Sequence, residues 1–434
     1  MIKFTRPVKA IIKTLANLKF AIGSLFLLGF VIAIGTIVEQ DQPLIFYQEN
    51  YPENNSLFGF LNWHFIVDLQ LNKIYTAWWF LSLVVLFASS LLSCTFTTQL
   101  PSIKAFKIWK FYSKEKFLKN LPVSTNFHPG KFNSMLYYCN AKNYNVFRQN
   151  KKGYAYVGLL GRVAPILVHF SIILLLFGSL FSAFNGFTAQ QFIPRGEVGH
   201  IQNLTKLGAI SNLPQDLNFR INDFWITYNS NLETDQFYSD ISIINDYGKE
   251  LNRKKIFVNE PLVFNGITFY QTDWDIIGLK VRLKDGKDFQ LPLKKLNKGG
   301  RNFWFCTLPT QPDSQSGISL LLNDLTGRVS VFSPNGTLLK VVSLGQNFEI
   351  TNGVELSLLS FLTITGVQIK ADPGIAIVYL SFLILMVSIY VSFFTYSQIW
   401  LLQTPDKIET GGTSNRAVLF FQQEFRQLTE QVNP

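Results

Sequence analysis

Four long apolar segments without a single charged side chain constrain this chain more than any other feature. They cover residues 20–38, 75–97, 163–184 and 375–400. A helix needs about 20 mostly apolar residues to cross the hydrocarbon core of a bilayer, which is roughly 30 Å thick. The segments are 19 to 26 residues long, which is long for a buried core helix of a soluble domain. We therefore predict a multi-pass α-helical membrane protein with four transmembrane helices.

The amount and the distribution of charge agree with a membrane protein. Charged residues make up 15% of the 434 residues, against roughly 25% in ordinary soluble domains. A net charge of +11 could indicate a nucleic-acid-binding protein. However, the excess lies in two blocks beside apolar segments, with +5 over residues 1–38 and +11 over residues 75–162. This pattern excludes nucleic acid as the expected partner, and the composition also excludes a disordered tail protein.

The positions of the basic residues predict the orientation, because short loops rich in Lys and Arg stay on the cytoplasmic or stromal side. Residues 1–19 carry five basic and no acidic side chains, and residues 98–162 carry twelve basic and one acidic. Residues 39–74 carry five acidic and one basic. We expect a stromal N-terminus, basic loop and C-terminal tail (401–434), and we expect loop 39–74 and segment 185–374 to be lumenal.

The first span is interpreted as a retained anchor. The apolar region of a signal peptide runs for 7–15 residues and ends at a small-residue cleavage site. This segment is longer, and no small-residue cleavage site follows it, since the sequence at its end is Thr36-Ile-Val-Glu39.

Segment 185–374 has the alternating pattern of β-strands. Leu279–Leu283 and Phe289–Leu293 flank an Asp-Gly turn, and Gly327–Phe332 and Leu338–Val342 flank a Ser-Pro-Asn-Gly turn. We predict a large lumenal all-β domain between the third and fourth helices, built as a sandwich or an open barrel. Its length is sufficient for a core of its own.

The sequence offers little chemistry. Cys94, Cys139 and Cys306 stand alone, without the Cys-x-x-Cys spacing of thiol exchange or the Cys-x-x-Cys-His of a c-type cytochrome. Phosphate-binding glycine loops and hydrolase elbows are also missing from the sequence. We predict no catalytic residue, and an enzymatic activity of this chain on its own is not expected.

His169 is the most informative of the four histidines. It lies seven residues into the third span, roughly 10 Å below the stromal face at about 1.5 Å per residue. Ionisable groups inside membrane spans are costly and often functional. The ring is either a neutral histidine bonded to a neighbouring helix or an axial ligand of an intramembrane metal or haem iron. Because no second histidine lies in a span, a six-coordinate haem would take its other ligand from a partner.

The remaining histidines are weaker candidates. His64 follows Trp63 in the loop before the second span, where we expect an interfacial structural role, and it is the alternative ligand. His128 and His200 lie in polar surroundings and are expected to be solvated.

Nine short motifs occur in order over nearly the whole chain. They are Ile34–Gln40, Thr76–Phe80, Leu91–Thr95, Gly161–His169, Asn259–Leu262, Phe269–Trp274, Asp372–Gly374, Gln398–Trp400 and Gly411–Ala417. Together with the four-span layout, they resemble the ResB-like, CcsB-type proteins of system II cytochrome c biogenesis, of the plastid and cyanobacterial kind. The basic loop is long, as in the plastid-type members.

The resemblance implies a membrane subunit required for haem delivery and covalent haem attachment to lumenal apocytochromes such as cytochrome f. It also implies a CcsA-type partner that carries a tryptophan-rich haem-handling motif, whereas the eight tryptophans here are scattered. His169 matches the family's membrane histidine and would ligate haem b in transit jointly with that partner. The β domain would hold the complex open for the apocytochrome or cover the haem site.

Two other functions remain open. One is a structural anchor or apocytochrome chaperone without a haem ligand of its own. The other is a transporter, which is less favoured because inverted repeats and broken helices are not recognisable.

The location is predicted from composition. Abundant Phe, Asn, Lys and Ile, together with the missing transit peptide, indicate a plastid-encoded protein of the thylakoid membrane. A cyanobacterial thylakoid is the alternative. The basic loop is expected to attract anionic membrane lipid.

Overall fold

The computed structural model describes residues 6–53, 61–101, 110–230, 234–298, 301–309, 317–349 and 355–432. The chain divides into two units, which are considered separately below. The first unit contains residues 1–183 and 374–434, and the second contains residues 184–373.

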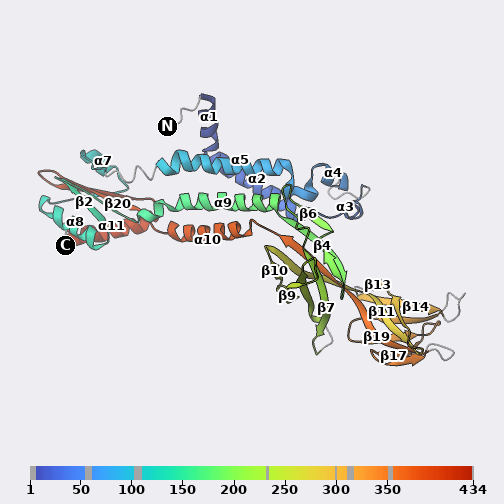
Figure 1. Cartoon of the computed structure of the whole chain (residues 1–434). Helices are drawn as coiled ribbons and strands as arrows, with labels where there is room; N and C mark the ends of the chain where they lie inside the picture. Colours follow the sequence, from blue (N-terminus) through green and yellow to red (C-terminus); the bar gives the residue numbers. More distant parts are fainter. Residues whose placement is uncertain are drawn as a thin grey trace. The chain divides into compact units, whose positions relative to one another are not determined.

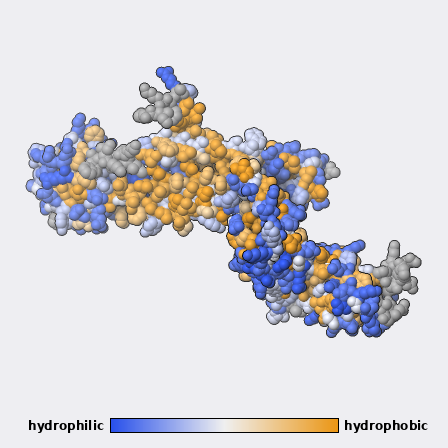
Figure 2. All heavy atoms as spheres, in the orientation of Figure 1, coloured by the Kyte–Doolittle hydropathy of each residue, from blue (hydrophilic) through white to orange (hydrophobic). Residues whose placement is uncertain are grey.

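Four helices of the first unit are long and apolar enough to cross a membrane, as predicted. They are α2 (Leu18–Ile37), α5 (Trp78–Cys94), α9 (Ala164–Asn185) and α10 (Ile375–Ser392). A π-helical turn, η3 (Thr95–Gln99), extends α5. Only 11% to 28% of the residues in their most apolar windows are buried. Hydrophobic residues cover the visible surface of α5, α9 and α10 (Figure 2), as in helices that face lipid.

Hydroxyl groups at the helix contacts bond within their own helix or to the next one. Ser381 and Ser388 are the buried residues of α10, and they donate to the carbonyls of Val378 at 2.6 Å and Leu385 at 2.7 Å. The backbone N–H of Gly374, before α10, donates to Ser182 Oγ on α9 at 3.1 Å. These three polar groups are thus satisfied, as an apolar environment requires.

The predicted fourth span, 375–400, is too long at its C-terminal end. The helix α10 ends at Ser392, and Ser397–Gln403 forms strand β20. This strand pairs with β3 (Lys152–Val157) and with β21 (Ile408–Ser414). Because β20 is apolar and follows α10 after four residues, hydropathy alone does not separate the strand from the helix.

Strand β20 belongs to a domain that joins the basic loop to the C-terminal tail. Its five-stranded antiparallel sheet has the order β1-β21-β20-β3-β2. The remaining elements are β1 (Val123–Phe127), β2 (Asn145–Gln149), α7 (Glu115–Lys119), η4 (Pro129–Lys131), α8 (Phe132–Ala141), η5 (Leu159–Arg162) and α11 (Val418–Val432). We call residues 110–162 and 397–432 the small α/β domain. Residues 102–109 of the predicted loop lie outside the described residues.

Both faces of this sheet are covered. Helices α8 and α11 pack on one face through Met135, Phe421 and Phe425, which are at most 2% exposed. The other face packs Leu118 of α7 against Tyr154 and Trp400. The segments predicted as a loop and a tail are therefore one folded domain with its own core.

Shorter helices complete the first unit. They are α1 (Arg6–Leu15), α3 (Leu44–Asn50), α4 (Trp63–Asp68) and η2 (Leu71–Thr76). Gln40 ties the end of α2 to η2, because its amide donates to Leu71 O at 2.9 Å and its carbonyl accepts from Ile74 N at 3.0 Å.

The second unit is all-β in its described residues, as predicted. Its strands are β4 (Phe187–Pro194), β5 (Val198–His200), β6 (Leu204–Leu207), β7 (Asn218–Tyr228), β8 (Thr234–Ile244), β9 (Glu250–Phe257), β10 (Leu262–Phe264), β11 (Ile267–Leu283), β12 (Asp288–Pro292), β13 (Lys294–Lys298), β14 (Arg301–Pro309), β15 (Gly317–Leu322), β16 (Arg328–Phe332), β17 (Leu338–Ser343), β18 (Asn347–Glu349) and β19 (Glu355–Ala371). The predicted hairpins are confirmed as β11–β12 and β16–β17.

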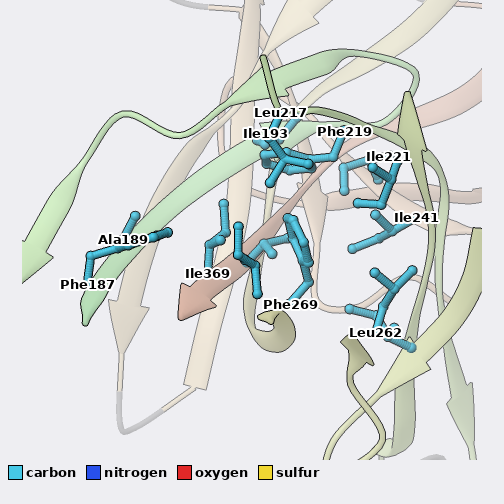
Figure 3. Close-up of a cluster of buried hydrophobic side chains, with 14 residues drawn as sticks. Phe187, Ala189, Ile193, Leu217, Phe219, Ile221, Ile241, Leu262, Phe269 and Ile369 are labelled. Carbon is cyan, nitrogen blue, oxygen red and sulfur yellow. The ribbon is translucent and has the colours of Figure 1, made fainter. Parts of the chain in front are cut away.

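Two long paired strands, β11 and β19, run through two separate cores (Figure 1). Near the start of β11, the sheet that contains β4, β11 and β19 packs on β7, β8 and β9 around Phe219 and Phe269, as Figure 3 shows. Near the end of β11, the same ribbon packs on β14–β17 around Trp304 and Leu320. The domain is therefore a pair of sandwiches that share one ribbon.

The small α/β domain provides a test of the fold. Phe421 is 1% exposed, and its neighbour Phe420 is 68% exposed. We expect Phe421→Ala to lower the free energy of unfolding of this domain by about 3–5 kcal/mol, because it empties the contact between α11 and the sheet. The matched control Phe420→Ala should change it by less than about 0.5 kcal/mol.

The measurement is pulse proteolysis of the purified full chain in increasing urea, in which cleavage at the turn before Lys152 is followed. Equal effects of the two substitutions would contradict the packing of the tail on the basic loop.

Candidate functional site

His169 bridges two of the long helices. It lies on α9, is half-buried, and contacts η3 at the end of α5 through both ring nitrogens. Nδ1 is 3.0 Å from Thr95 Oγ1, and Nε2 is 3.1 Å from Gln99 Nε2. The contact to a neighbouring helix, which is the structural alternative for this histidine, is therefore present.

The hydrogen bonds of Thr95 assign the proton of the His169 ring. The Thr95 hydroxyl donates to Leu91 O at 2.8 Å. A hydroxyl has a single proton, so toward His169 it accepts, and Nδ1 is the donor. In a neutral imidazole the other nitrogen then carries a lone pair. Nε2 accepts from the amide N–H of Gln99, which agrees with this tautomer.

The π-helical turn holds the two partners of His169. In η3 the N–H of Leu100 donates to Thr95 O, five residues back. Such turns occur mostly as single insertions in α-helices and often at functional sites. Thr95 and Gln99 are four residues apart and lie on the same side of the helix, where they contact opposite edges of one imidazole.

The hydrogen-bond partners of His169 are compatible with its imidazole acting as a single ligand to iron. A metal-bound histidine usually donates its second ring N–H to an acceptor that fixes the ring, and Thr95 accepts here. The nitrogen with the lone pair is covered by Gln99, so that side chain would have to move. The neighbouring Phe96 and Phe170 are 64% and 52% exposed and offer apolar surface. Among the described residues no three His, Cys, Asp or Glu side chains form a metal cluster.

The start of α9 is anchored in the small α/β domain. The Arg162 guanidinium lies over the Tyr396 ring, 4.7 Å from its centroid, and burial lowers the pKa of Arg162. Gly161 passes so close to the chain after α10 that a Cβ there would lie 1.8 Å from Phe394 O. Only glycine permits this approach, which fixes where α9 begins.

His64 lies at the opposite end of α5. Its Nε2 is 2.9 Å from Glu53 Oε1, its ring stacks on Trp63 at 3.5 Å, and its side chain is 52% exposed. This agrees with the structural role expected for it. The helix between Trp78 and Thr95 is about 26 Å long at about 1.5 Å per residue, so the structure does not bring His64 and His169 together. His128 and His200 are exposed.

Comparison with known proteins decides the family. A sequence profile of the ResB-like family matches residues 18–301 and 289–426. The chain belongs to the ResB-like family. The predicted resemblance is thereby confirmed.

Three relatives align over nearly their whole length. Cytochrome c biogenesis protein Ccs1 of Emiliania huxleyi is 49% identical over 422 residues, which are 97% of this chain and 96% of that protein. CcsB of Trichormus variabilis is 43% identical over 435 residues, 99% of this chain and 94% of the relative. Ccs1 of Rhodomonas salina is 41% identical over 437 residues, 100% of this chain and 99% of the relative.

Two residues of this ResB-like protein's site were not assigned from the sequence. Thr95 was recognised only as the end of a motif, and Gln99 was not recognised. The available signal was a threonine and a glutamine four residues apart at the end of an otherwise apolar span. Such polar side chains in a membrane helix usually contact another helix.

The cysteines of the folded domains are unreactive by environment. Cys139 is fully buried between α8 and the sheet, and burial raises its pKa to about 12. Burial raises the pKa of Cys306 in the large β domain to about 11. Because the thiolate is the nucleophile, neither thiol is poised for exchange at neutral pH.

This environment predicts the result of removing the thiols. A variant with Cys94→Ser, Cys139→Ala and Cys306→Ser should retain cytochrome assembly within about twofold of the wild type. In the folded wild-type chain, maleimide should modify Cys139 and Cys306 only as the pH approaches 11–12, where the thiolates form. Loss of assembly in a variant that accumulates normally would mean that one thiol has a function.

Proposed function

We propose that this ResB-like protein, a membrane subunit of system II cytochrome c biogenesis, supplies His169 as one axial ligand to the haem that is delivered to apocytochromes. The observation that carries the proposal is the tautomer of His169: the proton is held on Nδ1 by Thr95, and the lone pair is on Nε2. This is the form in which a neutral imidazole binds iron.

The chain's own residues hold and orient this ligand. The Thr95 hydroxyl keeps the ring in one plane and one tautomer. Gly161 and Arg162 fix the first turn of α9, two turns before His169. Haem is the cargo, and the apolar helix surfaces beside His169 suit a planar apolar molecule.

The second axial ligand belongs, in this proposal, to a haem-handling partner of the CcsA type. His64, on α4, is separated from His169 by about 26 Å of helix. His128 and His200 are exposed and lie outside the long helices. A shared site would place haem at a contact between two membrane subunits, near the stromal end of α9 and on the way to the lumenal apocytochromes.

We place the termini and the small α/β domain on the stromal side of the thylakoid membrane. The sequence of this domain and its flanks carries the basic excess of residues 75–162, and cationic segments remain on the stromal side. The large β domain, with no net charge, is then lumenal. Relatives from plastid-bearing algae and cyanobacteria agree with a thylakoid location. Basic side chains near the membrane also attract anionic lipid.

A structural anchor is the second candidate function. Both ring nitrogens of His169 have partners on the neighbouring helix, which is what a purely structural histidine would need. In that case haem would be handled by the partner alone.

Substitution of His169 tests the ligand role. His169→Ala should leave the protein inserted and reduce the haem that co-purifies with the complex by about tenfold or more, because a direct iron ligand is lost. Added imidazole should restore binding, since the substitution leaves a gap near the size of that ring. The measurement is the Soret absorbance of the purified complex.

His128→Ala is the matched control, because His128 is exposed and far from the long helices in sequence. It should leave the haem content unchanged. If His169→Ala keeps full haem content and full cytochrome assembly, the ligand assignment is wrong and the anchor function is favoured.

The orientation is tested by labelling single cysteines in a cysteine-free background. Lys151→Cys lies in the turn between β2 and β3, and Lys287→Cys lies next to the turn between β11 and β12; both positions are exposed. An impermeant maleimide should reach Lys151→Cys only from the stromal side and Lys287→Cys only from the lumenal side. Detergent provides the control in which both are labelled. Labelling of both from one side would rule out the proposed topology.

A further inference from the structure

We propose that Gln99 caps the haem-binding nitrogen of His169 and must release it before haem binds, whereas Thr95 is a positioning residue that prepares the same ring for haem. The two side chains would then act on haem binding in opposite directions. This inference rests on the proposed function, because it takes His169 as the ligand.

The positioning effect of Thr95 follows from its two hydrogen bonds. Its only proton goes to Leu91 O at 2.8 Å, within its own helix. The oxygen is therefore available to His169 only as an acceptor, and it binds Nδ1–H at 3.0 Å. The lone pair is thereby confined to Nε2. Without this acceptor the ring could also carry its proton on Nε2, and that tautomer cannot bind iron through Nε2.

The capping effect of Gln99 follows from the lone pair that this tautomer leaves on Nε2 of His169. Nε2 has one lone pair, and the Gln99 amide nitrogen lies 3.1 Å from it. An iron atom and an N–H donor cannot use the same lone pair. Haem binding at this nitrogen therefore includes the loss of the Gln99 hydrogen bond.

The place of Gln99 in its helix suits a side chain that moves. It is the last residue of the π-helical turn η3. Two residues later Pro101 has no backbone N–H, so the helical hydrogen bond from residue 101 to the carbonyl of Thr97 cannot form in this last turn. Thr95, in contrast, begins the turn and is bonded back into α5.

Haem affinity should therefore change with opposite sign at the two positions. Gln99→Leu removes the competing donor, and it should lower the apparent Kd for haem by about 2- to 10-fold, the range expected for one hydrogen bond. Thr95→Val removes the acceptor for Nδ1–H, and it should raise that Kd by about 10-fold, as for the loss of other hydrogen-bond partners of metal-bound histidines. If Thr95 and Gln99 had only a structural role, both substitutions would weaken haem binding.

The experiment uses the purified full chain in detergent, titrated with ferric protoporphyrin IX and followed by Soret absorbance. A second readout needs no haem: the nitrogen chemical shifts of isotope-labelled His169 distinguish the two tautomers. Gln99→Leu should keep the proton on Nδ1, and Thr95→Val should increase the Nε2–H form. Gln99→Ala repeats the first test should the leucine disturb the helix.

Two further variants serve as controls. Thr98→Val changes an exposed residue of the same turn and should leave both readouts unchanged. Thr95→Ser retains the hydroxyl and should restore the wild-type affinity and tautomer.

The outcomes separate this inference from the proposed function. If His169→Ala binds haem like the wild type, the ligand role fails, and the tautomer measurement still decides whether Thr95 and Gln99 arrange the ring as described. If His169→Ala loses haem but Gln99→Leu and Gln99→Ala bind it equally or more weakly than the wild type, the capping role is wrong and the ligand role stands. An unchanged tautomer in Thr95→Val overturns the positioning role of Thr95.

Discussion

A neutral imidazole in an apolar helix must place one donor and one acceptor. Leaving either unpaired away from water costs about 1–3 kcal/mol, and the contacts of His169 with Thr95 and Gln99 meet both requirements. The same two bonds connect α5 to α9, so helix association and the state of the ring depend on one another. In the proposed function, haem binding would exchange the hydrogen bond between His169 and Gln99 for an iron–nitrogen bond.

Much of the fold could be predicted because its signals are local. Uncharged segments of about 20 residues specify spans by composition alone, and the hairpins of the large β domain contain their own turns. The small α/β domain could not be predicted, because its sheet pairs Tyr154 with Trp400 across most of the chain. Strand β20 also follows α10 after only four residues and is equally apolar, so its hydropathy was assigned to the helix.

The candidate site likewise contains one residue that the sequence predicted and two that it did not. His169 was predictable because an ionisable side chain is conspicuous inside an apolar segment. Its partners were not, because the contact of Thr95 and Gln99 with His169 depends on the relative position of α5 and α9, which no local pattern encodes. The π-helical turn is a further reason: its i→i+5 bond shifts the register of the last turn of α5 relative to an ideal helix.

Two of the motifs on which the resemblance to the family was based lie at close contacts of the chain. At Gly412 an added Cβ would lie 2.5 Å from the ring of Phe421. In the large β domain, Thr365 donates to Gln271 at 2.9 Å beside a register shift of β11. These contacts give the motifs Gly411–Ala417 and Phe269–Trp274 a structural role.

The motif that ends at His169 combines the close packing of Gly161 with the hydrogen bonds of the His169 ring. Gly161 sets the start of α9 against the chain that follows α10. Val157, which precedes α9, pairs with Ser397, which follows α10. The β3–β20 ladder therefore holds the ends of α9 and α10 at one level. Because α9 begins beside this ladder, the sheet of the small α/β domain sets where His169 lies along the direction of α9. The domain formed by the basic loop and the tail thus helps to position His169, whose ring contacts Thr95 and Gln99 of the neighbouring helix.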